Sequence, residues 1–199
     1  METQLPIVDV REIANREENR FLLRDRDFHV ILDTCSIKRI PLTRQKTPLF
    51  AYQFEDKTLY YLVLTKGVCQ EVTDLTESIP WYLNQFVQAI TSEVIDQRIP
   101  EKNRNLIQMA NLMSSLGAGK ELNPMGENDI QIVNYAFERA RQDLQTLIVS
   151  FDTHIARSVR SLRGRKRWIR KNMFRIGLRD VIKELYPHIN PNNFPHIVN

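Results

Sequence analysis

The 199-residue sequence predicts one α/β domain with a mostly parallel central sheet, and three observations support this prediction. Short apolar runs of strand length alternate with longer amphipathic segments, the order expected of a parallel sheet covered by helices. The run at 28–32 is almost continuously apolar and the segment 145–151 has the apolar centre Leu-Ile-Val, as central strands buried on both faces do. Acidic residues follow both runs, where a strand should hand over to a helix.

In the first part of the chain, residues 7–24 carry apolar side chains among many charges and predict an N-terminal helix. The first strand follows at 28–32. Residues 58–65 are rich in aromatic and β-branched side chains and predict the next strand. Gly67 ends or bends that strand, and a helix is expected to begin near Val68.

The second part of the chain is expected to be mainly helical before its last strand. Helices are predicted over 81–95 and 105–116, and the second of these stops at the glycines near 117–119. The helix that opens at Asp129 has the clearest pattern, because its apolar residues recur at spacings of three and four. The strand at 145–151 follows.

The sheet needs one further short strand, and residues 115–122 are one candidate region for it. Residues 155–171 form a basic segment, and 180–185 predict a short helix.

Composition excludes several classes of protein. The two cysteines, Cys35 and Cys69, do not support a disulfide scaffold or a cysteine-built zinc site, and both are expected to be reduced. No apolar run approaches the roughly 20 residues that span a bilayer. The N-terminus lacks the pattern of a signal peptide, so a cytoplasmic protein is expected.

The net charge of +4 is unevenly distributed. Residues 153–199 contain eleven Lys and Arg but only two acidic residues, a net charge of +9. The remainder therefore carries −5. A mildly acidic body with a basic C-terminal part suggests a segment that binds a polyanion.

Four acidic residues stand at predicted junctions of strand and helix: Asp33, Glu71, Asp129 and Asp152. Each has an ordinary structural explanation, as a turn residue, a solvated helix residue, a helix cap or a strand end. Together they suggest more, because the carboxyl ends of parallel strands converge where open α/β sheets bind ligands. Carboxylates held together repel one another unless a cation lies between them, and oxygen ligands suit Mg²⁺ or Mn²⁺.

The order and context of these acids resemble the PIN-domain nucleases, over about residues 28–156. The family has an acid after an aliphatic first strand, a glutamate on the next helix, an aspartate heading a later helix, and a final aspartate after the fourth strand. The matching segments are Val-Ile-Leu-Asp-Thr at 30–34, Glu71, Asp-Ile-Gln-Ile at 129–132 with Ala136, and Val-Ser-Phe-Asp at 149–152. A further acid is common in the family two positions after the last one, where this chain has His154.

The resemblance implies a three-layer α/β/α sandwich and divalent-metal cleavage of RNA, or less commonly DNA, leaving a 5′-phosphate and a 3′-hydroxyl. Asp33, Asp129 and Asp152 would hold one or two Mg²⁺ or Mn²⁺, and Glu71 would complete the site or orient a water. Glu127, two residues before Asp129, is an alternative for the third metal ligand, although the helix pattern favours Asp129. The implied organisation is an N-terminal helical extension (1–27), a PIN-like core (28–156) and a basic C-terminal extension (157–199).

Four further residues could support such a site. Thr34, Ser36 and Ser150 could bond a carboxylate or a substrate phosphate, and ordinary turn chemistry explains them equally well. His154 could contact a phosphate, although a surface role is the simpler interpretation. The histidines show no zinc-ligand spacing.

The segment 153–179 contains no acidic residue, and its basic residues, most of them arginine, suit phosphate binding. Trp168 and Phe174 lie among them and could stack on bases, but packing on the core explains these aromatics better. An acidic protein partner is the alternative for the charges. The predicted nucleic-acid-binding residues are Arg157, Arg160, Arg163, Arg165, Lys166, Arg167, Arg170 and Lys171.

The segment 117–120 superficially resembles a phosphate-binding loop, but its spacing is wrong and Glu121 follows Lys120, so a helix stop and loop is expected. The leading hypothesis is a metal-dependent endoribonuclease with RNA as partner. An antitoxin or other protein partner and a homodimer are compatible with it, and no membrane is expected. The alternatives are a PIN-like module that binds RNA or protein without cutting, and a structure-specific DNA nuclease.

Overall fold

A computed structural model describes residues 7–17, 28–38, 51–53, 60–74, 93–119, 122–185 and 187–188. Five strands form an all-parallel sheet in the order β5-β4-β2-β6-β7. Their bounds are β2 Phe28–Leu32, β4 Tyr60–Thr65, β5 Glu93–Ile95, β6 Thr146–Val149 and β7 Met173–Ile176. The α/β class and the parallel sheet predicted from the sequence are thus confirmed.

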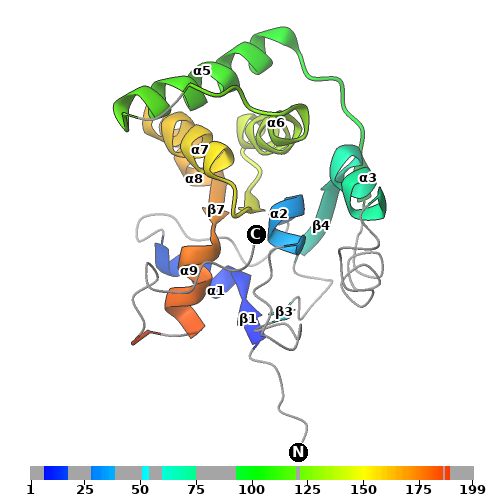
Figure 1. Cartoon of the computed structure of the whole chain (residues 1–199), viewed down its shortest axis with the longest axis vertical. Coiled ribbons are helices and arrows are strands. Elements are labelled where there is room, and N and C mark those ends of the chain that lie inside the picture. Colours follow the sequence, from blue (N-terminus) through cyan, green and yellow to red (C-terminus); the bar gives the residue numbers. More distant parts are fainter. Residues whose placement is uncertain are drawn as a thin grey trace, which may run out of the picture.

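Most of the helices around the sheet belong to two groups (Figure 1). Helices α5 to α8 gather in the upper half of the view, and α1 and α9 lie below β7, an arrangement compatible with a three-layer sandwich. The bounds are α1 Val10–Glu17, α2 Thr34–Lys38, α3 Lys66–Asp74, α5 Glu101–Gly117, α6 Glu127–Arg141, α7 Thr153–Arg165, α8 Arg167–Asn172 and α9 Leu178–Leu185. None of the helices in the described ranges is long and apolar enough to cross a membrane.

The two central strands are as buried as their apolar runs predicted. The side chains of Val30, Ile31, Leu147, Ile148 and Val149 are all inaccessible to solvent. Helix α6 is buried on all sides over residues 132–137, where the sequence pattern predicted a single buried face, and its acidic first turn and basic last turn both complement the helix dipole. Helix α5 ends at Gly117, and Gly119 adopts a φ of 62°, which confirms the predicted helix stop.

Two expectations near the ends of the sheet were wrong. Residues 7–9 form a strand, β1, paired in parallel with β3 (Ala51–Gln53), so the N-terminal helix begins only at Val10. The missing strand of the main sheet is β5 at 93–95, where the end of a helix was predicted, and not 115–122, because 115–117 end α5. The predicted helix residues 18–24 and 81–92 lie outside the described residues.

Strand β7 was not anticipated. It pairs with β6 along its length, and Phe174 at its centre is fully buried. The predicted core boundary at residue 156 falls inside α7, and the described residues beyond it contribute α7, α8 and β7 to the same layered structure.

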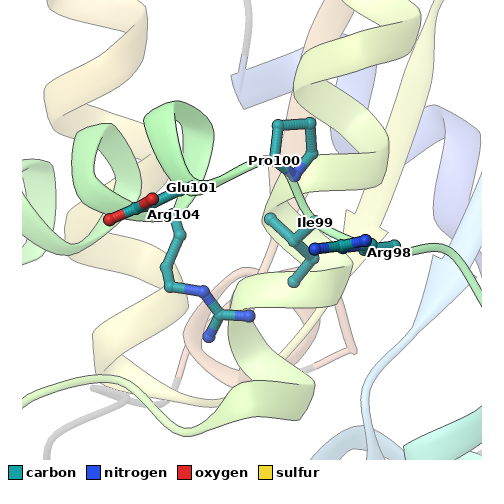
Figure 2. A pocket seen from close by; sticks show the side chains of 5 residues that line it. All are labelled: Arg98, Ile99, Pro100, Glu101 and Arg104. Carbon is teal, nitrogen blue, oxygen red and sulfur yellow. The ribbon is translucent and has the colours of Figure 1, made fainter.

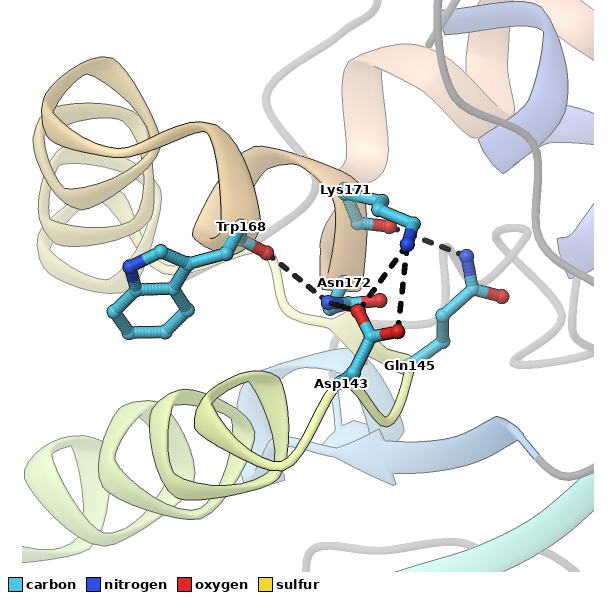
Figure 3. Close-up of polar contacts among 5 residues, drawn as sticks. All are labelled: Asp143, Gln145, Trp168, Lys171 and Asn172. Atoms are coloured by element: carbon cyan, nitrogen blue, oxygen red, sulfur yellow. Dashed lines mark hydrogen bonds and ion pairs between the residues drawn. The ribbon is translucent and has the colours of Figure 1, made fainter.

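A polar cluster fastens the start of β6 to the end of α8 (Figure 3). Asp143 has a φ of 60°, a turn conformation that Asp tolerates, and its Oδ1 accepts from Asn172 Nδ2 at 2.8 Å. Lys171 Nζ lies 3.3 Å from the same oxygen. Gln145 Nε2 donates to the carbonyl of Lys171 at 3.1 Å, and Asn172 Nδ2 also donates to the carbonyl of Trp168. This cluster lies at the amino end of β6, whereas Asp33 and Asp152 follow the carboxyl ends of β2 and β6.

Candidate active site

The four acidic residues follow neighbouring parallel strands. Asp33 comes directly after β2, and Asp152 caps α7 just beyond β6. Glu71 lies in α3, which begins where β4 ends, and Asp129 is in the first turn of α6. From β2 the chain moves to one side of the sheet through β4 and β5, then returns to β6 on the other side. The carboxyl ends of β2 and β6 therefore form the topological switch point, where open α/β sheets place their ligands.

Asp33 is fixed by two donors that reach the same oxygen. Ser150 Oγ donates to Asp33 Oδ2 at 2.7 Å, and the Cys35 thiol donates to it at 2.6 Å. The Asp33 side chain is only 5% exposed, while its backbone N–H donates to the carbonyl of Val149 at 3.0 Å. Its second oxygen, Oδ1, has no hydrogen-bond donor among the described residues.

Ser150 also connects Asp33 to Asp152. Its hydroxyl oxygen accepts the backbone N–H of Asp152 at 3.0 Å while the hydroxyl donates to Asp33. Asp152 Oδ1 then accepts the backbone N–H groups of His154 at 2.5 Å and Ile155 at 3.2 Å, an N-cap that satisfies the first turn of α7. Asp152 Oδ2 has no donor in the described part of the chain.

Glu71 is held from the neighbouring helix. Asn128 Nδ2, at the start of α6, donates to Glu71 Oε1. Gly67 makes this approach sterically allowed, because a Cβ atom there would lie 1.7 Å from the Asn128 side-chain oxygen. The sequence thus brings α3 and the start of α6 together through one glycine, and Asp129 follows Asn128 directly.

The electrostatics show that these four acids share one region. Burial raises the pKa of Asp129 to about 7, with further contributions from the carboxylates of Asp152, Asp33 and Glu71. The pKa of Asp33 is also raised, mainly by burial and in part by Asp152 and Glu71, although its thiol and hydroxyl donors oppose the shift. Burial and the adjacent Asp33 carboxylate raise the pKa of the Cys35 thiol, which therefore stays protonated and able to donate.

Within the described residues, no three His, Cys, Asp or Glu side chains lie close enough together to hold a metal ion as they stand. The chemistry of the donors nevertheless fits a hard divalent cation, because every candidate ligand is a carboxylate. Asp33, Glu71 and Asp152 each have one oxygen held by donors and one oxygen without a donor from a described residue. The rival Glu127 is exposed and paired with Arg104, which holds the pKa of Glu127 below its ordinary value.

The four supporting residues take different roles. Ser150 bonds a carboxylate, one of its two predicted roles. Ser36 Oγ instead donates to the carbonyl of Asp33 at 2.7 Å, which is ordinary turn chemistry. Thr34 Oγ1 is buried and has no partner among the described residues. His154 Nδ1 lies 3.3 Å from Asn111 Oδ1 and is therefore directed toward α5.

The eight predicted nucleic-acid-binding residues divide by exposure. Four are exposed: Arg160, Arg165, Lys166 and Arg167. Four are partly buried: Arg157, Arg163, Arg170 and Lys171. Arg157 Nη1 donates to Ser115 Oγ at 3.2 Å, and Lys171 pairs with Asp143. Of the eight residues, the four exposed ones are the most accessible to a large polyanion.

Neither aromatic residue of the basic segment is free to stack on bases. Phe174 is buried in β7, and Trp168 packs against Phe137, with ring centroids 5.5 Å apart. Core packing, the simpler of the two explanations, is therefore the correct one.

Three residues at this site were not predicted: Cys35, Asn128 and Arg175. Arg175, in β7, donates from Nη2 to the carbonyl of Ser150 at 3.0 Å. Cys35 and Asn128 are sequence neighbours of predicted acids, and that adjacency was the available signal. Arg175 was marked only as one of the basic residues of 153–179, and nothing indicated its contact with Ser150, because its position depends on the unanticipated strand.

A separate surface pocket of about 490 Å³ opens beside the start of α5 (Figure 2). It is lined by Arg98, Ile99, Pro100, Glu101 and Arg104. The Arg104 side chain extends from α5 toward this space, and its pairing with Glu127 connects the pocket wall to the start of α6. None of the four acidic residues lines this pocket.

In comparisons with known proteins, the chain matched no protein-family model, no curated protein and no solved structure.

Proposed function

We propose that this protein is a PIN-like, divalent-metal-dependent endoribonuclease with a three-layer α/β/α core. The observation that carries the proposal is the meeting of Asp33, Glu71, Asp129 and Asp152 at the switch point, where the other three carboxylates raise the pKa of Asp129. Mutual repulsion in a buried site is costly, and a bound cation relieves it.

The carboxylates are suited to such a cation because their orientations are already set. Ser150, Cys35, the first turn of α7 and Asn128 fix one oxygen each of Asp33, Asp152 and Glu71. The remaining oxygens, together with Asp129, would hold one or two Mg²⁺ or Mn²⁺ ions. When bound, the metal would lower the pKa of a water ligand and stabilise charge on the leaving oxygen.

The protein's own residues would perform the remaining tasks. Asp33 and Asp152 would be held in place by the shared Ser150 hydroxyl, so their separation would change little during turnover. Glu71, fixed through one oxygen, could orient a water with the other. The exposed cations of α7 and α8 would bind the RNA backbone by its phosphates.

The first test is cleavage of end-labelled single-stranded RNA and DNA in Mn²⁺ or in EDTA. Cleavage by the parent protein should require metal and favour RNA, leaving a 5′-phosphate. Asp33→Asn should reduce the rate by roughly a hundredfold or more, because it removes a charged ligand while keeping the side-chain shape.

Asp143→Asn is the matched control, since Asp143 lies at the opposite end of β6 and asparagine tolerates its positive φ. This variant should cut like the parent. Equal loss in both variants, or cutting that persists in EDTA, would count against the proposal. Preferential cleavage of structured DNA would instead identify the DNA nuclease.

Two observations favour a second candidate, a PIN-like module that binds RNA or protein without cutting. The acids of the described chain are not drawn together tightly enough to share an ion as they stand, and His154 occupies a position that is often acidic in PIN nucleases. A folded parent that binds RNA but does not cut it in Mn²⁺ or Mg²⁺ would favour this candidate.

A further inference from the structure

Arg175 is a partly buried cation at the edge of the candidate active site. It is the third residue of β7, opposite Ile148 of β6, and its Nη2 donates to the Ser150 carbonyl at 3.0 Å. Ser150 is also the residue whose hydroxyl connects Asp33 and Asp152. The guanidinium therefore bonds the residue that connects Asp33 and Asp152.

The site around Arg175 is closely built. A Cβ atom at Gly177 would lie 2.4 Å from Nη2, so the glycine leaves room for the guanidinium. Arg175 Nε is fully buried and has no hydrogen-bond partner among the described residues. Asp180, whose negative charge raises the pKa of Arg175, uses its Oδ2 to accept the Gly177 N–H at 2.6 Å.

No ion pair within 4 Å joins Arg175 to a carboxylate of the described residues. Burial lowers the pKa of Arg175; the carboxylate of Asp180 opposes this shift, whereas the positive charge of Arg160 adds to it. Arg160 extends from α7 into solvent, so the two like charges lie within electrostatic reach of each other. Like charges gathered at one place indicate a ligand of opposite charge, as they do for the acids nearby.

We propose that Arg160 and Arg175 form a binding site for one RNA backbone phosphate, adjacent to the phosphodiester that the carboxylates would act on. This inference rests on the proposed function and specifies how its substrate is positioned. Guanidinium groups suit a phosphate because they donate paired hydrogen bonds to its oxygens. Arg175, anchored on the Ser150 carbonyl, sets the position of this phosphate relative to Asp33 and Asp152, while Arg160 receives it at the surface.

Binding without turnover separates this inference from the proposed function. The probe is a short fluorescein-labelled single-stranded RNA in EDTA, with affinity measured by fluorescence anisotropy over a series of salt concentrations. Arg160→Gln should weaken binding by about tenfold, as expected for the loss of a charged hydrogen-bonding group. It should also reduce the slope of log affinity against log salt by about 0.7, the value for one phosphate contact on a single strand.

Arg175→Lys keeps the charge but loses the paired donors, so it should also weaken binding while changing the salt slope less. Arg141→Gln, which removes an exposed arginine of α6, is the matched control and should bind like the parent. Thermal unfolding would show whether Arg175→Lys is folded, and the exposed Arg160 variant keeps the test decisive if it is not.

Parent-like affinity and salt slope in Arg160→Gln would overturn the phosphate site, whether or not the parent cuts RNA. Failure of the parent to bind RNA would overturn it as well. Selective loss of binding in the Arg160 and Arg175 variants would support it even if no cleavage were found, in which case only the nuclease proposal would fail.

Discussion

At the scale of single residues, Ser150 organises the candidate site. Its hydroxyl donates to Asp33 and accepts from the backbone of Asp152, and its carbonyl accepts from Arg175. The acids themselves could be identified from their positions after apolar runs. The donors that orient them could not, because a serine or cysteine in a turn has the same local sequence whether it bonds a carboxylate or its own backbone.

The raised pKa of Asp129 predicts how stability depends on pH in the absence of metal. A folded-state pKa of about 7, above the ordinary 3.8, means that the native protein binds this proton more tightly than the unfolded chain does. The free energy of unfolding should therefore fall as pH rises from about 4 to about 7. Asp129→Asn removes this titration, so its stability relative to the parent should increase by about 1–3 kcal/mol between those limits, a range reduced for partial exposure.

Urea denaturation in EDTA, near pH 5 and near pH 8, measures this difference. Glu127→Gln is the control with the opposite sign, because the ion pair with Arg104 lowers the pKa of Glu127. That variant should gain nothing at the higher pH. A stability difference between Asp129→Asn and the parent that does not change with pH would contradict the raised pKa of Asp129.

At the scale of elements, the sequence predicted strands and helices that are long or uniformly apolar. Strands β2 and β6 and helix α6 were predicted because each has many residues that report the same pattern. Strands β1 and β5 have three residues each, too few for an alternation to be recognised. Strand β7 was hidden because Arg175 interrupts its apolar residues and basic helices precede it.

The burial of Phe174 predicts that β7 contributes strongly to the stability of the fold. Phe174→Ala removes a side chain with 0% exposure from the central core, so it should destabilise the protein by about 3–5 kcal/mol. Trp168→Ala should cost less, since Trp168 is only partly buried and packs at the edge of that core. Chemical denaturation of the two variants measures both effects. A Phe174 variant as stable as the parent would mean that β7 is dispensable to the fold.

At the scale of the whole molecule, sheet topology brings together acids that are far apart in the chain. The order β5-β4-β2-β6-β7 places the ends of β2, β4 and β6 along one edge, so residues 33, 71 and 152 meet there. Helix α7 then begins at this edge with Asp152 and continues for 13 residues, roughly 20 Å, to Arg165. The basic residues are therefore arranged along a helix that runs from the candidate active site outward.

This placement of the basic residues predicts how RNA binding depends on salt concentration. Arg165, Lys166 and Arg167 are exposed where α7 gives way to α8, so each is able to neutralise one phosphate of a bound strand. Replacing all three with glutamine should reduce the slope of log affinity against log salt by about 2, at about 0.7 per contact, and should weaken binding similarly for unrelated sequences. Fluorescence anisotropy in EDTA measures both quantities. Because these residues lie a helix length from the acids, the triple variant should still cut at the parent's rate once RNA is saturating. A salt slope equal to that of the parent would mean that bound RNA does not lie along α7.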